Sequence, residues 1–219
     1  MHVNEHGVRA AAVLAAIFML AACGSGAPTA TDTPKASSPA GTGTATNPVA
    51  RLTFRGGQES ARIGPYTQVY LTPLPSNAAQ ARVIKDFRAG QILWAESNEA
   101  LRPVAPILSY VTGVARHDLM SALAAGRERH LVPAGTERFF QTRVVALSGN
   151  NATVTTCDDS RKFRQQNPRT GIVNPAYTPR PDQAFVFESW QLVLRSRRWA
   201  LAAFSLAVLP DSRARPCQP

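Results

Sequence analysis

The stretch QTRVVALSGNNATVTTCDD, residues 141–159, carries the clearest structural signal in the chain. On either side of the Gly-Asn-Asn triplet at 149–151, the residues alternate in polarity and are rich in β-branched side chains, which is typical of strands. Gly and Asn are also the residues that tight turns between antiparallel strands require. We therefore predict a β-hairpin whose strands run from Phe139 to Leu147 and from Ala152 to Cys157.

A second hairpin is predicted downstream. Its strands run from Ala184 to Leu194 and from Trp199 to Val208, around a turn at Ser196 and Arg197. A long polar segment with four prolines, Asp158 to about Pro181, separates the two hairpins and is predicted to be a loop.

Two helices are predicted upstream of the hairpins. The first begins at a capping residue, Ser76, and runs to about Ala100, with an apolar repeat at Ile84, Phe87, Gln91 and Trp94. The second is capped by Thr112 and runs from Gly113 to about His130, with an apolar side of Val114, Leu119, Met120 and Leu123. Pro133 and Gly135 end it. Helices followed by antiparallel strands predict an α+β domain, with the helices on one face of the sheet.

The order of elements from Ser76 to Cys217 resembles the cystatin-like α+β cone of NTF2-like (SnoaL-like) proteins. The resemblance extends to the strand RVVAL at 143–147 and the closing RWAL at 198–201. It is strongest for secreted and lipid-anchored members, which have a Thr-x-Cys-x-Asp motif at a strand end and a second cysteine near the C-terminus. In this chain, these residues are Thr155, Cys157, Asp159 and Cys217. The resemblance implies a curved antiparallel sheet with helices packed on it, an internal apolar pocket and, in many relatives, homodimers.

Four aromatic residues are the candidate walls of that pocket: Phe87, Trp94, Phe187 and Trp190. The alternative is that they fill the core, which is the commoner role of aromatic stripes.

The N-terminus predicts export and lipidation. Residues 1–22 have a polar start and a short apolar stretch, as signal peptides do. Leu20, Ala21, Ala22 and Cys23 resemble the lipobox of bacterial lipoproteins, which implies cleavage before Cys23 and its modification with diacylglycerol and palmitate; the alternative is a plain secretory signal. Residues 23–48 are nearly all Gly, Ala, Ser, Thr and Pro and predict a disordered tether. The domains are therefore 1–22, 23–48, an irregular or edge-strand leader at 49–75, and the NTF2-like domain at 76–219.

Lipidation of Cys23 would leave two cysteines, Cys157 and Cys217. In an oxidising compartment we predict that they form a disulfide that ties down the C-terminal tail. A catalytic thiol or a metal pair is the alternative, but no CxxC spacing is present.

No catalytic, metal or cofactor site is predicted. Asp158 and Asp159 are adjacent, so on a strand they would point to opposite faces, and turn or surface roles are expected. His117 and His130 are too far apart on one helix to share a metal. The chain has neither a Gly-x-Ser-x-Gly nucleophile motif nor a phosphate-binding glycine loop.

The formal net charge of +10 comes mainly from arginine. A candidate basic patch comprises Arg161, Lys162, Arg164, Arg195, Arg197 and Arg198. Such a patch would suit anionic lipid or wall polymer, although an ordinary solvated surface is the alternative. The predicted location, on the outer face of the cytoplasmic membrane, disfavours nucleic acid.

Three classes of function follow from the sequence. The first is a non-catalytic, membrane-anchored envelope lipoprotein whose NTF2-like domain binds a partner or a small ligand. The second is an adhesive or structural module that acts through its basic surface. The third, an enzyme of the isomerase or cyclase kind, would require a deep pocket with an inward-facing acid or histidine.

Overall fold

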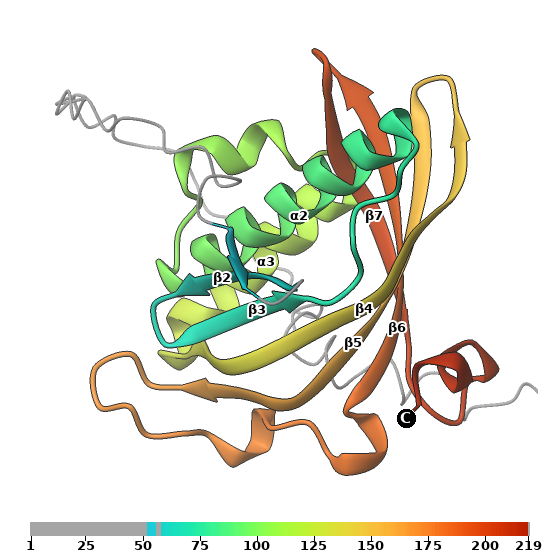
Figure 1. Ribbon diagram of the computed structural model, residues 1–219. Helices are drawn as coiled ribbons and strands as arrows, with labels where there is room; N and C mark the ends of the chain where they lie inside the picture. The colour runs from blue at the N-terminus through green and yellow to red at the C-terminus, as the bar shows by residue number, and fades with distance from the viewer. Residues whose placement is uncertain (1–51, 56–57, 219) are drawn as a thin grey trace, which may run out of the picture.

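The computed structural model of the chain describes residues 52–55 and 58–218 (Figure 1). The predicted export signal at 1–22, the lipidated Cys23 and the tether at 23–48 lie outside the described residues.

A seven-stranded sheet forms the framework of the domain, and its strands neighbour one another in chain order. The strands are β1 (Thr53–Arg55), β2 (Gln58–Ile63), β3 (Tyr66–Tyr70), β4 (Val132–Ser148), β5 (Asn151–Gln166), β6 (Phe185–Arg195) and β7 (Arg198–Ala207). Every neighbouring pair is antiparallel except β3 and β4, which run parallel. The parallel pair arises because the chain leaves the sheet after β3, forms both helices, and returns as β4.

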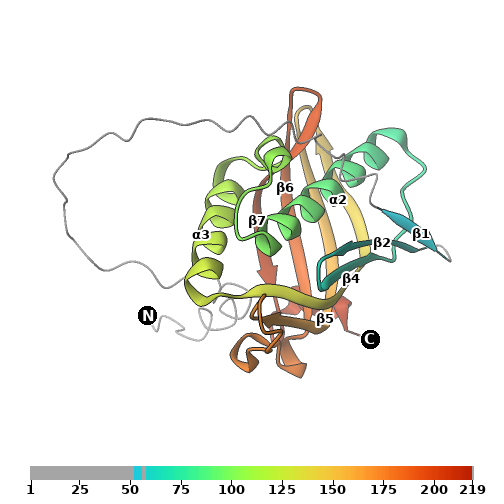
Figure 2. The same cartoon turned by 90° about the vertical axis from the view of Figure 1, so that its left-hand side faces the viewer.

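The helices are α2 (Ala78–Glu99) and α3 (Gly113–Arg129), and both lie on the concave side of the curled sheet (Figure 2). Shorter 3-10 helices are η3 (Ala105–Ser109), η4 (Pro175–Tyr177), η5 (Pro181–Gln183) and η6 (Ser212–Cys217). The predicted fold class, α+β with helices packed on a curved sheet, is confirmed.

The predicted cap of the first helix is off by one residue, whereas that of the second is at the predicted position, Thr112. The cap of α2 is Asn77 rather than Ser76, and its side-chain oxygen accepts a hydrogen bond of 3.1 Å from the Gln80 amide. Thr112 does precede α3, but its side chain makes no capping bond and instead accepts a hydrogen bond from Arg195. The backbone positions of the helix starts were therefore predictable to within two residues, whereas the capping bonds were not.

The main core lies between the two helices and strands β5 to β7. Phe87, Leu119, Leu123 and Leu201 are fully buried in it. The predicted apolar side of α3 is wrong at two positions, since Val114 is 58% and Met120 is 42% exposed. Of the four predicted apolar residues, only Leu119 and Leu123 are buried against the rest of the domain.

The sheet is more extensive than the sequence predicted. The leader at 49–75, for which edge strands or coil were both open, contributes β1, β2 and β3. β5 runs on to Gln166, so the predicted loop at 158–181 is wrong over its first nine residues. This extension was hidden because several residues on its interior face are polar, among them Asp158 and Ser160, which are both buried.

Irregular pairing between β4 and β5 curls the sheet. The register shifts at three places along the pair, between Thr136 and Arg138, between Phe140 and Arg143, and between Val144 and Ala146. Extra residues of this kind bend a strand and increase its twist. The long β4–β5 pair therefore bends around the helices instead of lying flat.

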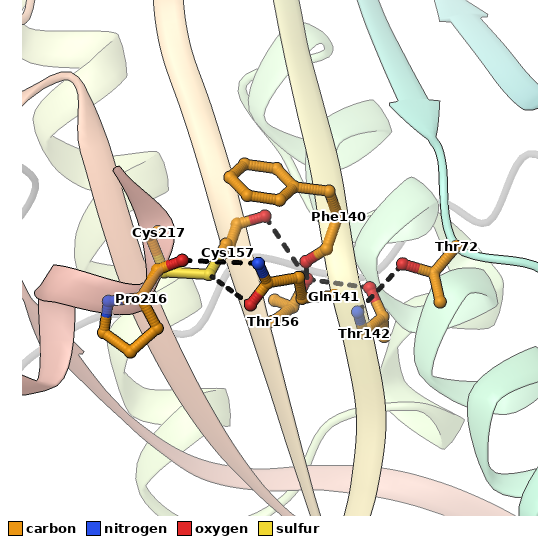
Figure 3. The surroundings of a disulfide bond; sticks show 8 residues. All are labelled: Thr72, Phe140, Gln141, Thr142, Thr156, Cys157, Pro216 and Cys217. Atoms are coloured by element: carbon orange, nitrogen blue, oxygen red, sulfur yellow. Dashed lines mark hydrogen bonds between the residues drawn. A yellow bond between two sulfur atoms is a disulfide. The ribbon is translucent and has the colours of Figure 1, made fainter. Parts of the chain in front are cut away.

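The predicted disulfide between Cys157 and Cys217 is confirmed, with Cα atoms 5.3 Å apart. It joins β5 to η6 on the side of the sheet away from α2 (Figure 3). Beside it, the side-chain amide of Gln141 donates a hydrogen bond of 3.3 Å to the Pro216 carbonyl. The C-terminal segment is thus held to the sheet by a covalent bond and a hydrogen bond.

Replacing both cysteines, Cys157→Ser with Cys217→Ser, should lower the free energy of unfolding by on the order of 4 kcal/mol. The reason is that the bridge closes a loop with a sequence separation of 60 and so restricts the unfolded chain. Urea unfolding measures the loss, and the wild-type chain under reducing conditions is the control. A change below about 1 kcal/mol would show that the bridge adds little.

Gly135 in β4 has φ of +83°, and a Cβ there would lie 1.9 Å from the Lys162 carbonyl oxygen. Gly135→Ala should therefore destabilise the domain by at least about 2 kcal/mol. Gly149→Ala is the matched control, because φ is +54° there but no atom lies within 4 Å of the added carbon. It should cost only about 1 kcal/mol. Equal losses in thermal or urea unfolding would contradict the steric account.

Candidate ligand-binding cavity

A cavity of about 150 Å³ lies inside the cone, between the C-terminal half of α2, the C-terminal half of α3 and the concave face of the sheet. Small residues on the helices leave the space open, namely Ala95, Ala122, Ala125 and Gly126. Six aromatic side chains contribute to the remaining wall: Tyr66, Trp94, Phe139, Phe163, Trp190 and Phe204. The cavity is therefore largely apolar.

Three of the aromatic side chains form a packed group between α2 and the sheet. The rings of Trp190 and Phe204 stack with centroids 4.5 Å apart, and Trp94 meets each of them edge-on at 6.0 Å. Such contacts hold large side chains in fixed rotamers. The wall of the cavity is therefore tightly packed at this end.

Three carboxylic acids converge on the concave face of the sheet. Glu137 comes from β4, Asp158 from β5 and Glu188 from β6, and all three are buried. Glu137 and Glu188 line the cavity. Three of the chain's 14 acidic residues therefore gather at the interior of a protein whose net charge is +10.

Each of the two lining glutamates is oriented by a donor from the sheet. The Tyr66 hydroxyl donates to Oε2 of Glu137, while the Trp190 indole N–H donates to Oε2 of Glu188 over 2.7 Å. Gln68 extends the first contact, because its amide donates to the Tyr66 hydroxyl at 3.4 Å and accepts from Tyr70 at 3.0 Å. A chain of buried hydrogen bonds thus fixes the position of the Glu137 carboxyl.

Burial raises the pKa of both glutamates to about 7. For Glu137 the nearby Glu188 carboxylate adds to the rise in pKa, whereas the Tyr66 hydrogen bond opposes it. For Glu188 the Trp190 hydrogen bond opposes the effect of burial on the pKa. The pKa of Asp158 is also raised, by burial first and then by the charges of Glu137, Glu188 and Asp159. Near neutral pH, protons are therefore shared among these carboxyls.

The structure corrects the expected role of Asp158. The two adjacent aspartates do point to opposite faces, but Asp158 is 1% exposed and belongs to the interior group rather than to a turn or the surface. Asp159 accepts hydrogen bonds of 2.8 Å from Arg161, which lower its pKa. Glu137 and Glu188 were not identified from the sequence at all.

The four predicted pocket residues divide between different places. Trp94 and Trp190 line the cavity. Phe87 instead is fully buried in the main core, where its ring meets Trp190 edge-on at 6.0 Å. Phe187 packs on the opposite face of the sheet, beside the disulfide. The prediction is wrong for Phe87 and Phe187. Successive side chains of a strand point to opposite faces, so Phe187 lies outside because its neighbour Glu188 points into the cavity.

The predicted basic patch is two separate groups. Arg161, Lys162 and Arg164 lie near the end of β5, whereas Arg195, Arg197 and Arg198 lie at the β6–β7 turn. Asn151, at the start of β5, pairs with Val193, so the two groups are about ten residues, or roughly 30 Å, apart along the strand. The structure therefore does not assemble a single basic surface from these six residues.

The described part of the chain contains neither a candidate metal-binding group nor a helix that could span a membrane. Among residues 52–55 and 58–218, no three His, Cys, Asp or Glu side chains are grouped so that they could hold a metal ion. No helix within the same ranges is long and apolar enough to cross a membrane.

No protein-family model matches the sequence, and no curated protein does. Among solved structures, the chain is similar to the intermembrane space region of the chloroplast protein ARC6, with 11% identity and a TM-score of 0.41 over 63% of this chain and 99% of that one. It is also similar to a ketosteroid isomerase-like protein from Erwinia carotovora atroseptica SCRI1043, with 15% identity and a TM-score of 0.37 over 61% and 98%. At these values, the function of this chain has to be inferred from its own residues.

The acid group predicts an unusual dependence of stability on pH. Because the pKa of Glu137 is about 7 in the folded state against an ordinary 4.5, the folded chain binds more protons than the unfolded chain between these values. The free energy of unfolding should therefore fall as pH rises from about 4.5 to above 7. Glu137→Gln should remove part of this fall and be more stable than wild type at pH 8, by on the order of 1 to 3 kcal/mol.

Urea unfolding across the pH range tests this, and Glu128→Gln, at an exposed position on α3, is the matched control. If Glu137→Gln were less stable than wild type above pH 7, the burial of these acids would not be the dominant effect.

Proposed function

We propose that this chain is a non-catalytic ligand-binding lipoprotein with an NTF2-like cone, and that its cavity binds a small, mostly apolar molecule that carries one polar group. The observation that carries the proposal is an aromatic-walled cavity into which two buried glutamates project. Ligand sites in proteins are typically of this kind, with apolar walls and a few placed polar groups that set orientation.

The size of the cavity limits the ligand. A dry engineered cavity of about 150 Å³ accommodates benzene. The cavity here is of the same size, about 150 Å³, and six aromatic side chains contribute to its walls. We expect the enclosed part of the ligand to be about one ring in size.

A proton-transfer enzyme is the second candidate function. It is favoured by one observation, a buried glutamate with a pKa of about 7 that faces a cavity, which suits a general acid or base. However, the Tyr66 hydroxyl donates to Glu137 itself and is not directed at a bound molecule. Binding without turnover is therefore our first proposal.

The proposed location is the outer face of the cytoplasmic membrane, through lipidation at Cys23. The sequence supports this through the lipobox-like residues Leu20 to Cys23. A disulfide between Cys157 and Cys217 adds support, because disulfides persist mainly outside reducing compartments. Contact of the two basic groups with anionic lipid or wall polymer, and homodimer formation, remain predictions.

Benzyl alcohol is a suitable probe of the cavity, with calorimetry and thermal unfolding of the full chain as measurements. It should bind the wild-type chain and raise its Tm. Ala122→Leu should abolish binding, because Ala122 lines the cavity. Ala124→Leu is the matched control, since Ala124 lies on the exposed side of the same helix. Absence of binding to wild type, or equal binding by both variants, would contradict the proposal.

A further inference from the structure

The interior charge of the cavity is acidic, in contrast to the molecule as a whole. The charged side chains that line it are Glu137, Glu188 and Arg129, and Asp158 lies behind them within electrostatic range of both glutamates. Arg129 belongs to the last turn of α3, and its guanidinium lies 5.3 Å from the centre of the Tyr177 ring in the surface loop. The three carboxyls therefore outnumber the cations around this space.

Arg88, the one fully buried cation among the described residues, is engaged elsewhere. Arg88 of α2 makes an ion pair of 2.5 Å with Glu59 and donates to the Thr72 carbonyl, while its guanidinium lies over the Tyr70 ring. Arg88 does not line the cavity. Glu188 accepts its hydrogen bond from the neutral indole of Trp190.

Two buried polar atoms at the site lack a hydrogen-bond partner among the described residues. They are Nε2 of Gln91, on α2, and Oδ1 of Asp158. Gln91 is 7% exposed, and its side chain borders the cavity. An amide can offer a donor or, after rotation, an acceptor. Unpaired buried groups are costly, so a ligand that gives the Gln91 amide a hydrogen-bond partner gains affinity.

The aromatic walls would also favour a positive charge. Indole and phenyl faces attract cations, most strongly where water is excluded. Trp94, Trp190 and Phe204 stand at the same cavity as the two glutamates. An ammonium group on an apolar body would therefore meet carboxylates and ring faces together.

We infer that the cavity selects small organic cations, namely protonated amines with an apolar body about one ring in size. This inference rests on the proposed ligand-binding function and names the class of ligand. A bound ammonium would donate hydrogen bonds to Glu137 and Glu188. Its positive charge would also reduce the repulsion among the three carboxylates, which in the empty cavity is reduced by protonation. A neutral molecule of the same shape gains neither effect.

Benzylamine and benzyl alcohol are a matched pair of probes for the full chain, because they differ mainly in charge. Calorimetry should show that benzylamine binds at least about tenfold more tightly at pH 8 than at pH 5.5, since deprotonation of the carboxyls with a pKa of about 7 precedes its binding. At pH 6 its binding should release protons to the buffer. The affinity for benzyl alcohol should change little over the same range.

Amino-acid substitutions distinguish the effect of the carboxylate charges on binding from that of the cavity's shape. Glu188→Gln and Glu137→Gln should each weaken benzylamine binding at pH 8 at least about tenfold, and retained binding of benzyl alcohol would show that the cavity is intact. Glu128→Gln, on the exposed side of α3, should leave both affinities unchanged. Equal affinity of wild type for the two probes at pH 8, or an amine preference that survives both substitutions, would overturn the inference. Failure of both probes to bind wild type would overturn the ligand-binding proposal as well.

Discussion

The close approach of α2 to the sheet at Gly90 is the constraint on which the shape of the domain depends. A Cβ at this position would lie 3.0 Å from the side chain of Leu201 in β7, so a larger residue would require Leu201 or the helix to shift. On the N-terminal side of Gly90, residues such as Phe87 are fully buried in a continuous core. On its C-terminal side, Gln91, Trp94 and Asn98 face the cavity. The N-terminal part of α2 therefore packs in the core, and its C-terminal part covers the cavity.

The shape of the site also depends on the curl of the sheet, which places three acidic side chains in the interior of the domain. Pairing irregularities along β4 and β5 bend the two longest strands, and Glu137 lies at one of these irregularities, between Thr136 and Arg138. The curl brings Glu137 together with Asp158 and Glu188 from the next two strands. Buried carboxyls are stable only when they are protonated or paired, so their clustering implies that the interior is adapted to hold protons or a cation.

The helices and hairpins were predictable because their signals are local. A three-to-four apolar repeat placed α2, and the Gly-Asn turn placed the β4–β5 hairpin. The extent of β5 was not predictable, because polar residues on its interior face resemble a loop when the partner strands are unknown. The parallel pairing of β3 with β4 was likewise hidden, since it depends on contacts between segments more than 60 residues apart.

The site was only partly predictable for the same reason. Trp94 and Trp190 stand out as aromatic residues, but Glu137, Asp158 and Glu188 come together only through strand register. A signal for Glu188 was present in the alternation Val186, Glu188, Trp190, which places a carboxyl on the same face as two buried apolar residues. Strand alternation around an acid is therefore a more useful indicator of this kind of site than the adjacent pair Asp158 and Asp159.

The most direct test of the account is a carbon-detected NMR titration of the glutamate side-chain carboxyls in the folded chain. The account predicts that two of them, assigned to Glu137 and Glu188 by substitution, titrate near pH 7. If both of these carboxyls instead titrated near the ordinary value of 4.5, burial would not raise their pKa values, and the central claim would be contradicted.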